Sequence, residues 1–410
     1  MGSTALAMKA RRSFADDRPF AWCLLGTWLL TAATHYYVIT PASVLGVVAG
    51  DLGTSEARAI WLVSAVPASW AVTNFVLGVW IDRLGDYRMI GIGTVIVVLA
   101  GIGSWWTALD GAFLPLMGTR LAAGVAVGVI WTASTNLIGG AVSAANRGTA
   151  IGVFLTSAPA GFALGQLSVP HVSAAVGWQS NFLLTGLAAG LAFALVTVGI
   201  RGLPVTPPTN TASVGANFSI VSEHRIVWYA SAMAFAAYSY YLFMNSWLPS
   251  YLTEEFALSA ELSGLLAAVF PAMGVLSRAG GGFISDRLLG QRRVPVLQAA
   301  FLVSLPLVVL IAGTRWLALI VAALVVAGFV IQLTFGVVYS YVQESVDADV
   351  SGTALAFVTT AGISGAFSAP IVAGELIELS GSYLLAFAYA TVLTAMGLVV
   401  SVSAPESRRS

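Results

Sequence analysis

Long apolar stretches recur along the chain and are separated by short clusters of polar and turn-forming residues. A helix that crosses the hydrocarbon layer, about 30 Å thick, needs about 20 mostly apolar residues because it rises about 1.5 Å per residue. By this measure the pattern predicts an all-α membrane protein with twelve spanning helices. They cover residues 20–40, 60–81, 89–107, 112–138, 147–170, 179–200, 227–249, 261–284, 294–312, 316–342, 352–374 and 382–404.

Composition supports this prediction and excludes several classes of protein. Apolar residues make up 58% of the chain, charged residues only 9%, and the mean hydropathy is +0.89, which excludes a water-soluble globule. The net charge of zero argues against nucleic acid as a partner. The single cysteine, Cys23, rules out a disulfide within the chain and a cysteine-based zinc site. With no metal cluster, phosphate loop or nucleophile–base set, we expect neither a cofactor nor an enzyme.

The distribution of basic residues predicts the orientation in the membrane. If both termini lie in the cytoplasm, 14 of the 18 Lys and Arg residues fall in cytoplasmic segments. Only Arg58 and Arg315 then lie in outer loops, and Arg120 and Arg278 lie within spans. Such an excess of positive charge is typical of the cytoplasmic side. We therefore expect a multi-pass plasma-membrane protein, monomeric in the bilayer, with cytoplasmic termini.

The chain also repeats itself with a constant offset of 204 residues. Matching pairs are Pro67 and Pro271, Gly78 and Gly282, Asp82-Arg83 and Asp286-Arg287, Arg88 and Arg292, and Gly161 and Gly365. An even duplication of six-span units is typical of transporters whose halves move about a site between them. The predicted division is a tail (1–19), a six-helix bundle (20–200), a linker (201–226), a second six-helix bundle (227–404) and a tail (405–410).

The loop after the second span carries a specific motif. Residues Gly78 to Arg88, with Asp82-Arg83 at the centre, resemble the loop signature of the major facilitator superfamily, and Gly282 to Arg292 is a weaker second copy. The fourth span, with Arg120 followed by two spaced glycines, is similar to that family's arginine–glycine motif. The resemblance implies two six-helix bundles that rock about a central site. It also implies a conformational latch and coupling set, which we assign to Asp82, Arg83, Arg88, Arg120, Asp286 and Arg287.

Charges inside the spans indicate what a central site could bind. Two arginines lie within spans, whereas no carboxylate lies deep in one. A buried charge costs several kcal/mol unless it is paired, and a guanidinium suits a carboxylate or oxyanion. The spacing of Arg278 before Asp286 is similar to the eighth-span arginine of oxalate/formate and monocarboxylate porters, which implies that it binds the anion. In the alternative interpretation, Arg278 snorkels toward the cytoplasm and only stiffens helix packing.

Further candidates flank these arginines. Arg120 is expected to brace helices or tune coupling, with substrate contact as the alternative. His35 lies in the middle of the first span and could be the proton-coupling residue, or a neutral histidine bonded between helices. Paired tyrosines at equivalent places in the two halves are expected to line the cavity: Tyr36, Tyr37, Tyr240 and Tyr241. The remaining polar candidates are Asn74, which matches Arg278 in the repeat, and Asn245; Asn136, Gln332 and Gln343 have no specific expected role.

These observations together predict a secondary active transporter for a small, monocarboxylate-like organic anion, coupled to protons or working by exchange. A nitrate or nitrite porter is disfavoured because Asn74 stands where such porters resemble one another in having a second arginine. A multidrug exporter of the same fold usually needs an embedded carboxylate. A receptor or scaffold would be expected to carry a larger soluble domain than the 26-residue linker.

Overall fold

The computed structural model describes residues 18–201, 203, 224–283, 285, 290 and 292–406, and all regular structure in these residues is helical. The first half contains α2 (Arg18–Ser43), α3 (Leu45–Asp51), α4 (Glu56–Ala59), α5 (Trp61–Leu84), α6 (Asp86–Leu109), α7 (Phe113–Ala141), α8 (Ala144–Leu155), α9 (Ser157–Val176) and α10 (Ser180–Ile200). The second half contains α12 (Arg225–Phe256), α13 (Ala260–Phe283), α14 (Val294–Gly313), α15 (Leu317–Gln332), α16 (Thr334–Gln343), α17 (Ala348–Ser380) and α18 (Leu384–Ser403).

These helices account for the predicted spans as two sets of six. Each set contains one span made of two consecutive helices, α8 with α9 and α15 with α16. Within the described residues, nine segments are long and apolar enough to cross a membrane, or ten if α2 and α3, bent by 71°, count as one. The predicted all-α class is confirmed. The predicted tail 1–19 and linker 201–226 fall mostly outside the described residues, as do Asp286 and Arg287.

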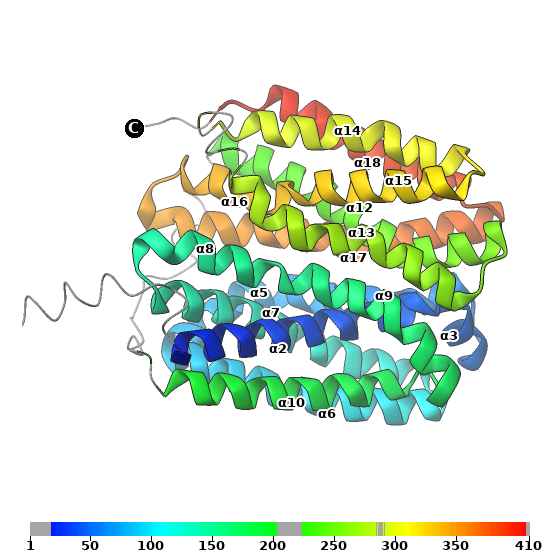
Figure 1. Cartoon of the computed structure of the whole chain (residues 1–410), viewed down its shortest axis with the longest axis horizontal. Helices are drawn as coiled ribbons and strands as arrows, with labels where there is room; N and C mark the ends of the chain where they lie inside the picture. Colours follow the sequence, from blue (N-terminus) through cyan, green and yellow to red (C-terminus); the bar gives the residue numbers. More distant parts are fainter. Residues whose placement is uncertain are drawn as a thin grey trace, which may run out of the picture.

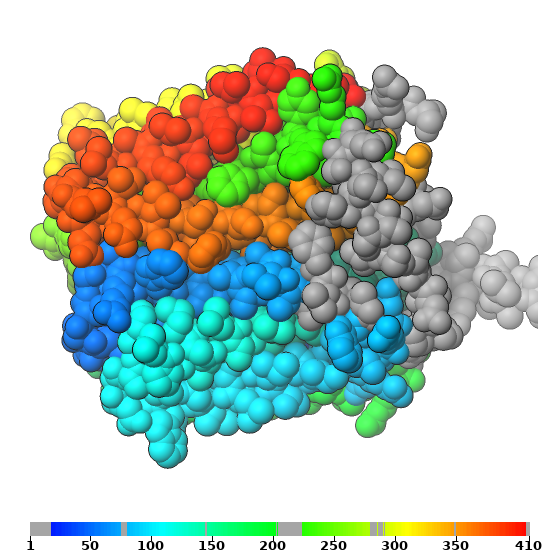
Figure 2. All heavy atoms as spheres, turned by 180° about the vertical axis from the view of Figure 1, so that it is seen from behind, coloured from blue at the N-terminus to red at the C-terminus, as the bar shows by residue number. Residues whose placement is uncertain are grey.

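The two sets of helices form adjacent bundles. In Figure 1 the helices α2 to α10 lie below and α12 to α18 above, with long axes roughly parallel. The bundles meet mainly where α9 packs against α13 and α5 against α17. Figure 2 shows the orange α17 lying along the blue segments of the first half. We call the end where α2 begins and α18 ends the terminal face, and the opposite end the distal face.

Arg120 on α7 braces the first bundle. Pro41 in α2 has no N–H, so the carbonyl of Tyr37, four residues earlier, lacks its usual helical partner. The Nη1 of Arg120 donates to this carbonyl at 2.7 Å, Nη2 to that of Val38 at 2.8 Å, and Nε to that of Leu62 on α5 at 2.8 Å. The side chain is fully buried. These contacts favour the bracing interpretation of Arg120 over substrate contact.

A second proline-freed carbonyl joins the two bundles. Pro249 in α12 leaves the carbonyl of Asn245 without a helical donor, and Nε2 of Gln166 on α9 donates to it at 2.6 Å. Both side chains are buried. Close to this bond, Gly264 on α13 lies directly against the backbone carbonyl of Gln166, where no side chain would fit. This part of the interface therefore allows backbones to touch across the halves.

Contacts near the distal face close that end of the interface. A Cβ added at Gly374 on α17 would lie 2.9 Å from the Trp247 ring and 3.2 Å from the Cα of Ala57. The indole of Trp247 donates to the Pro370 carbonyl at 2.9 Å, and the rings of Trp61 and Phe367 lie 6.4 Å apart across the halves. Trp247 and Ala57 are almost completely buried. The two halves are thus packed together at the distal face.

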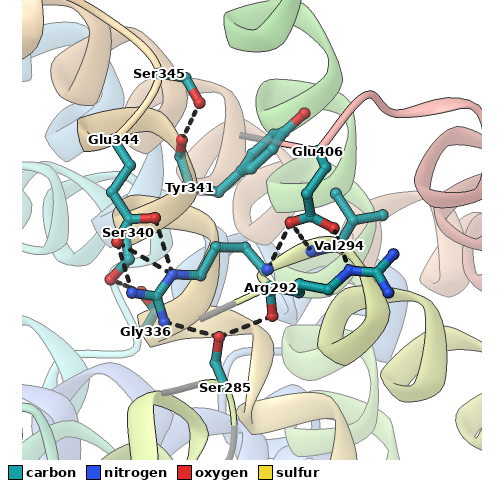
Figure 3. A network of polar contacts seen from close by, with 10 residues as sticks. Ser285, Arg292, Val294, Gly336, Ser340, Tyr341, Glu344, Ser345 and Glu406 are labelled. Atoms are coloured by element: carbon teal, nitrogen blue, oxygen red, sulfur yellow. Dashed lines mark hydrogen bonds and ion pairs between the residues drawn. The ribbon is translucent and has the colours of Figure 1, made fainter. Parts of the chain in front are cut away.

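A polar network organises the terminal face of the second bundle (Figure 3). The Nη2 of Arg293, at the start of α14, lies 2.5 Å from Glu344 at the end of α16, and its Nη1 donates to Ser285 at 2.7 Å. Glu406, just beyond α18, accepts the backbone N–H of Arg293 at 2.7 Å and that of Val294 at 3.2 Å. A carboxylate at a helix N-terminus is stabilised by the unpaired N–H groups and the helix dipole. The network ties three chain segments to α14.

Glu344→Gln is expected to lower the free energy of unfolding by about 1.5–3 kcal/mol, the usual contribution of a hydrogen bond to a charged group. Arg293 is buried and would lose its ion pair with Glu344. The matched control is Glu255→Gln, which breaks the exposed pair with Arg315 and should change stability little. Unfolding of the purified variants in detergent measures both; equal effects would contradict a structural role for the network.

A pH-dependent distal closure is also expected. Burial, followed by the neighbouring Glu254 carboxylate, raises the pKa of Glu56 to about 7, against a hydrogen bond from Ser250. Because the closed arrangement raises this pKa above its ordinary value, protonated Glu56 stabilises closure at low pH, and this contribution is lost as the pH rises through about 7. The Tyr383 side chain interacts electrostatically with the carboxyl groups of Glu56 and Glu254, so it belongs to the same cluster.

The measurement uses Ala57→Cys in a Cys23→Ser background and a membrane-impermeant maleimide. Labelling should rise above pH 7 by more than the intrinsic reactivity of a thiol explains. The same cysteine with Glu56→Gln is the control, because glutamine keeps the closed form neutral at every pH. An identical pH profile with and without Glu56 would exclude this switch.

Candidate functional site

A cavity of about 50 Å³ lies between the two bundles. In the first half α2, α5, α7 and α9 contribute to its wall, and in the second half α12, α13 and α17. Its lining residues are His35, Val38, Val66, Pro67, Trp70, Trp131, Ala158, Phe162, Tyr238, Tyr241, Leu242, Arg278, Ile363 and Ala366. The repeat thus produces one site from both copies, as expected for a duplicated bundle.

Arg278 on α13 is the cationic group of this cavity, and only 8% of its surface is exposed. Its guanidinium carbon lies 4.6 Å from the centre of the Phe335 ring and 5.5 Å from that of Tyr241. Its Nε donates to Oε1 of Gln332 at 3.3 Å. Within the part of the chain that the structure describes, no carboxylate lines the cavity and no ion pair involves Arg278. Aromatic faces and one amide surround the charge without neutralising it.

Gln332 on α15 holds Arg278 in place. Its Nε2 donates to the carbonyls of Phe270 at 3.1 Å and Gly328 at 3.0 Å, which leaves Oε1 directed at Arg278. The amide fits only because residue 274 is glycine, since a Cβ there would overlap Oε1. The sequence assigned no role to Gln332. The sequence nonetheless contained a signal for this contact. At the offset of 204 residues, a large residue is paired with glycine at Trp70 and Gly274, and the reverse holds at Gly128 and Gln332, which indicates that the large and the small position touch in each half.

His35 on α2 lines the first-half side of the cavity and is 6% exposed. Its Nδ1 lies 2.8 Å from the Thr31 carbonyl, so in the neutral ring Nδ1 carries the proton and Nε2 is the nitrogen that gains or loses one. The rings of Phe162 and Trp131 lie 5.6 and 5.7 Å away, and that of Trp70 lies 6.5 Å away. The structure therefore brings His35 and Arg278, two separate candidates from the sequence, to one cavity.

Of the four tyrosines expected to line the cavity, the structure places only Tyr241 there. Tyr36 instead donates to Asn181 at 2.5 Å, and Tyr37 bonds Ser104 at 2.6 Å, so both point into the first bundle. Tyr240 is fully buried against Phe270. The expectation of cavity lining was wrong for these three, because consecutive helical residues point about 100° apart and cannot share one face.

Tyr238, which the sequence interpretation missed, does line the cavity. It precedes Tyr241 by three residues, the spacing that places two side chains on one helix face. Its hydroxyl lies 3.3 Å from that of Tyr339, and its ring packs edge-on against Phe335, with centroids 4.5 Å apart. Tyr238 and Tyr241 thus form a continuous tyrosine face of α12 beside Arg278.

The two candidate asparagines lie outside the cavity wall. Asn74 on α5 donates to the Ala356 carbonyl at 3.2 Å and to the Thr360 hydroxyl at 3.1 Å, both on α17. It joins the two halves at the position where the repeat places Arg278 in the second copy. Asn245 bonds the carbonyl of Tyr241 within α12 at 2.8 Å and accepts from Gln166. Both asparagines therefore contribute to helix contacts.

Of the predicted latch and coupling residues, Arg120 lies buried on α7, whereas Asp82, Arg83 and Arg88 lie at the end of α5 and the start of α6. Asp82 is half-buried, whereas Arg83 and Arg88 are exposed on the terminal face. Asp286 and Arg287, their counterparts in the repeat, lie outside the described residues. The latch role stays a prediction for all of them. In the second copy, the polar network that the structure does describe is the Arg293–Glu344 pair, which the sequence interpretation did not identify.

Comparison with known proteins places the chain in a family. The model of the Major Facilitator Superfamily matches residues 25–370. Among curated relatives, the chain is 26% identical to a hexuronate transporter of Bacillus subtilis, over 86% of each chain. It is 25% identical to the cis,cis-muconate transport protein of Acinetobacter baylyi, over 84% of each, and 22% identical to a nitrite extrusion protein of Bacillus subtilis, over 84% and 85%.

These relatives are transporters and not enzymes, in agreement with the sequence-based expectation. The matched segment covers most of both bundles, including the signature loop and every residue that lines the cavity. The chain is therefore a multi-pass membrane protein that belongs to the Major Facilitator Superfamily.

Proposed function

We propose that this protein is a secondary active transporter that moves a small organic anion across the plasma membrane by alternating access. The observation that carries the proposal is Arg278, a buried cation in a cavity between the two bundles, with no carboxylate beside it in the described chain. A buried charge without a partner is costly, and a bound anion removes that cost. The relatives named for hexuronate, muconate and nitrite transport support an anion as the cargo.

Alternating access requires that the cavity open to one side at a time, and we assign this movement to the two bundles, residues 20–200 and 227–404. The packing of Trp247, Ala57 and Gly374 holds the distal side closed in this arrangement. The positive-inside distribution supports a cytoplasmic terminal face, so the distal side would face outward. Asp82, Arg83 and Arg88 would then form the cytoplasmic latch that opens and closes as the bundles rock.

We further propose that His35 couples transport to protons. An imidazolium at His35 and a bound anion attract each other, so protonation and anion binding favour one another within the same cavity. Proton and anion would therefore load together and leave together, which is the condition for symport.

The alternatives have weaker support. A nitrate or nitrite porter would be expected to offer a second cation, whereas Asn74, the counterpart of Arg278 in the repeat, bonds α17 instead. A multidrug exporter that attracts cations would need a carboxylate in the cavity, whereas the charged side chain found there is an arginine. An organic monoanion fits both the single charge and the apolar wall.

Arg278→Lys is expected to lose most of the affinity for the substrate anion, because lysine cannot reproduce the bidentate guanidinium fork. Arg278→Gln should lose about 1.5–3 kcal/mol of binding free energy, or roughly 10- to 150-fold in affinity. Binding and proteoliposome uptake of labelled benzoate, muconate, glucuronate and nitrate measure this loss. Arg315→Gln, at an exposed arginine of the distal face, is the control. Full affinity in the Lys variant would make Arg278 a packing residue.

His35→Gln is expected to abolish the stimulation of uptake by an imposed pH gradient while exchange of labelled for unlabelled anion continues. Glutamine can keep a hydrogen bond to the Thr31 carbonyl but cannot titrate. The matched control is His171→Gln, because His171 makes the same bond to the carbonyl four residues earlier, at 3.0 Å, but is exposed. A gradient response that survives in His35→Gln would assign coupling to another group.

A further inference from the structure

We propose that the substrate is an aromatic monocarboxylate, whose ring packs in an aromatic box of the first half while its carboxylate pairs with Arg278 of the second half. The aromatic box consists of Trp70, Trp131 and Phe162, with His35 between them. This inference rests on the proposed anion transport and specifies the chemistry of the cargo.

The wall of the cavity is the first argument. Of its fourteen lining residues, six carry aromatic rings and seven are aliphatic, and Arg278 is the fourteenth. The described lining contains no Ser, Thr, Asn, Gln, Asp or Glu. Apart from Arg278 and His35, its polar side-chain groups are the hydroxyls of Tyr238 and Tyr241 and the indole N–H groups of Trp70 and Trp131. A substrate covered with hydroxyl groups would find fewer hydrogen-bond partners there than in water, which is unfavourable for each hydroxyl left unpaired. An apolar body, in contrast, gains from leaving water.

The arrangement of the rings is the second argument. In the box, the centroids of Trp70 and Trp131 lie 6.0 Å apart, and those of His35 and Phe162 lie 5.6 Å apart. Phe162 continues the series across the interface to Tyr241, 5.5 Å away and edge-on. Rings tilted at these distances pack against one another, and the sides that they turn toward the cavity form an aromatic surface on which a flat guest could pack. Tyr241 in turn lies against the guanidinium of Arg278.

The internal repeat shows how the two halves acquired different tasks, and this is the third argument. Trp70 packs closely against α7 because residue 128 is glycine; a Cβ there would lie 2.5 Å from the indole Cδ1. In the second half the same pair of positions is reversed, since Gly274 gives room to Gln332, which supports Arg278. One half therefore supplies a ring wall and the other a positioned cation.

The permanent charge of the lining favours a substrate with one carboxylate. Arg278 is the single arginine or lysine in the lining, so while His35 is neutral a dianion would leave its second charge in an apolar wall. A small inorganic anion would pair with Arg278 but has no ring to pack against the aromatic box. A molecule with one carboxylate at the edge of a ring contacts both halves at once, and this contact favours the state in which the bundles are close together.

The test compares ligands of matched charge and size on the purified full-length protein. The probes are benzoate, cyclohexanecarboxylate, glucuronate, terephthalate and nitrate, each measured for binding and for competition with labelled benzoate uptake. Benzoate should bind at least tenfold more tightly than glucuronate, terephthalate and nitrate, and severalfold more tightly than cyclohexanecarboxylate, which has one charge but no flat face. Tighter binding of glucuronate, terephthalate or nitrate than of benzoate would overturn the proposal.

A variant isolates the contribution of the ring faces. Phe162→Leu keeps an apolar side chain but removes the ring, and should weaken benzoate about two- to tenfold while changing cyclohexanecarboxylate little. The control is Phe193→Leu, because Phe193 stacks on Tyr87 at 5.7 Å, away from the cavity. Equal losses for the two ligands would contradict ring packing. Trp131→Phe, a mild change, should reduce the quenching of tryptophan fluorescence by benzoate, and unchanged quenching would count against the box.

Failure of this inference can be told apart from failure of the transport proposal. If glucuronate binds better than benzoate and its binding is lost in Arg278→Gln, the anion site stands and only the aromatic class is wrong. If none of the anions binds or none depends on Arg278, the proposed function itself fails.

Discussion

A guanidinium held inside an apolar protein is the constraint on which the rest of this structure depends. Such a charge loses its hydration, and the surroundings must replace it. Around Arg278 the replacement is partial: one amide oxygen from Gln332 and the faces of Phe335 and Tyr241. These groups orient the cation but leave its charge unbalanced. The cavity between the bundles, the glycine that admits Gln332 and the tyrosine face of α12 all serve this one residue.

Proline-freed carbonyls provide the second structural theme. Helices in a membrane satisfy their backbone groups internally, so a proline leaves one strong acceptor without a donor. Arg120 fills the acceptor that Pro41 creates, and Gln166 fills the one that Pro249 creates. The first bond stiffens one bundle and the second crosses between bundles. A bond across a moving interface must break when the halves separate, so the carbonyl of Asn245 needs another partner, such as water, in the open state.

The sequence predicted the helices, and it offered the duplication and the candidates His35 and Arg278, because each rests on a strong regularity. The length of an apolar segment, a constant offset between repeats and a charged residue within an apolar segment are all visible in the linear sequence. The direction of a side chain around its helix is not, and for this reason Tyr36, Tyr37 and Tyr240 were misplaced. Spacing of three residues, as in Tyr238 with Tyr241 or His35 with Val38, would have selected the cavity face. Gln332 was missed because its role depends on empty space at Gly274, 58 residues away in sequence.

The two copies of the repeat differ in a complementary way. Trp70 corresponds to Gly274, and Gly128 corresponds to Gln332, and this difference has an evolutionary consequence. After duplication, two identical bundles would have offered identical walls to a cargo that is itself unsymmetrical. The two copies now differ at these two pairs of positions and at Asn74 and Arg278, so that one copy supplies the charge and the other the ring wall. Selection could then alter the ring wall of the first half without disturbing Arg278 in the second half. A transporter built in this way can change its substrate specificity by mutations in a single half while it keeps its preference for anions.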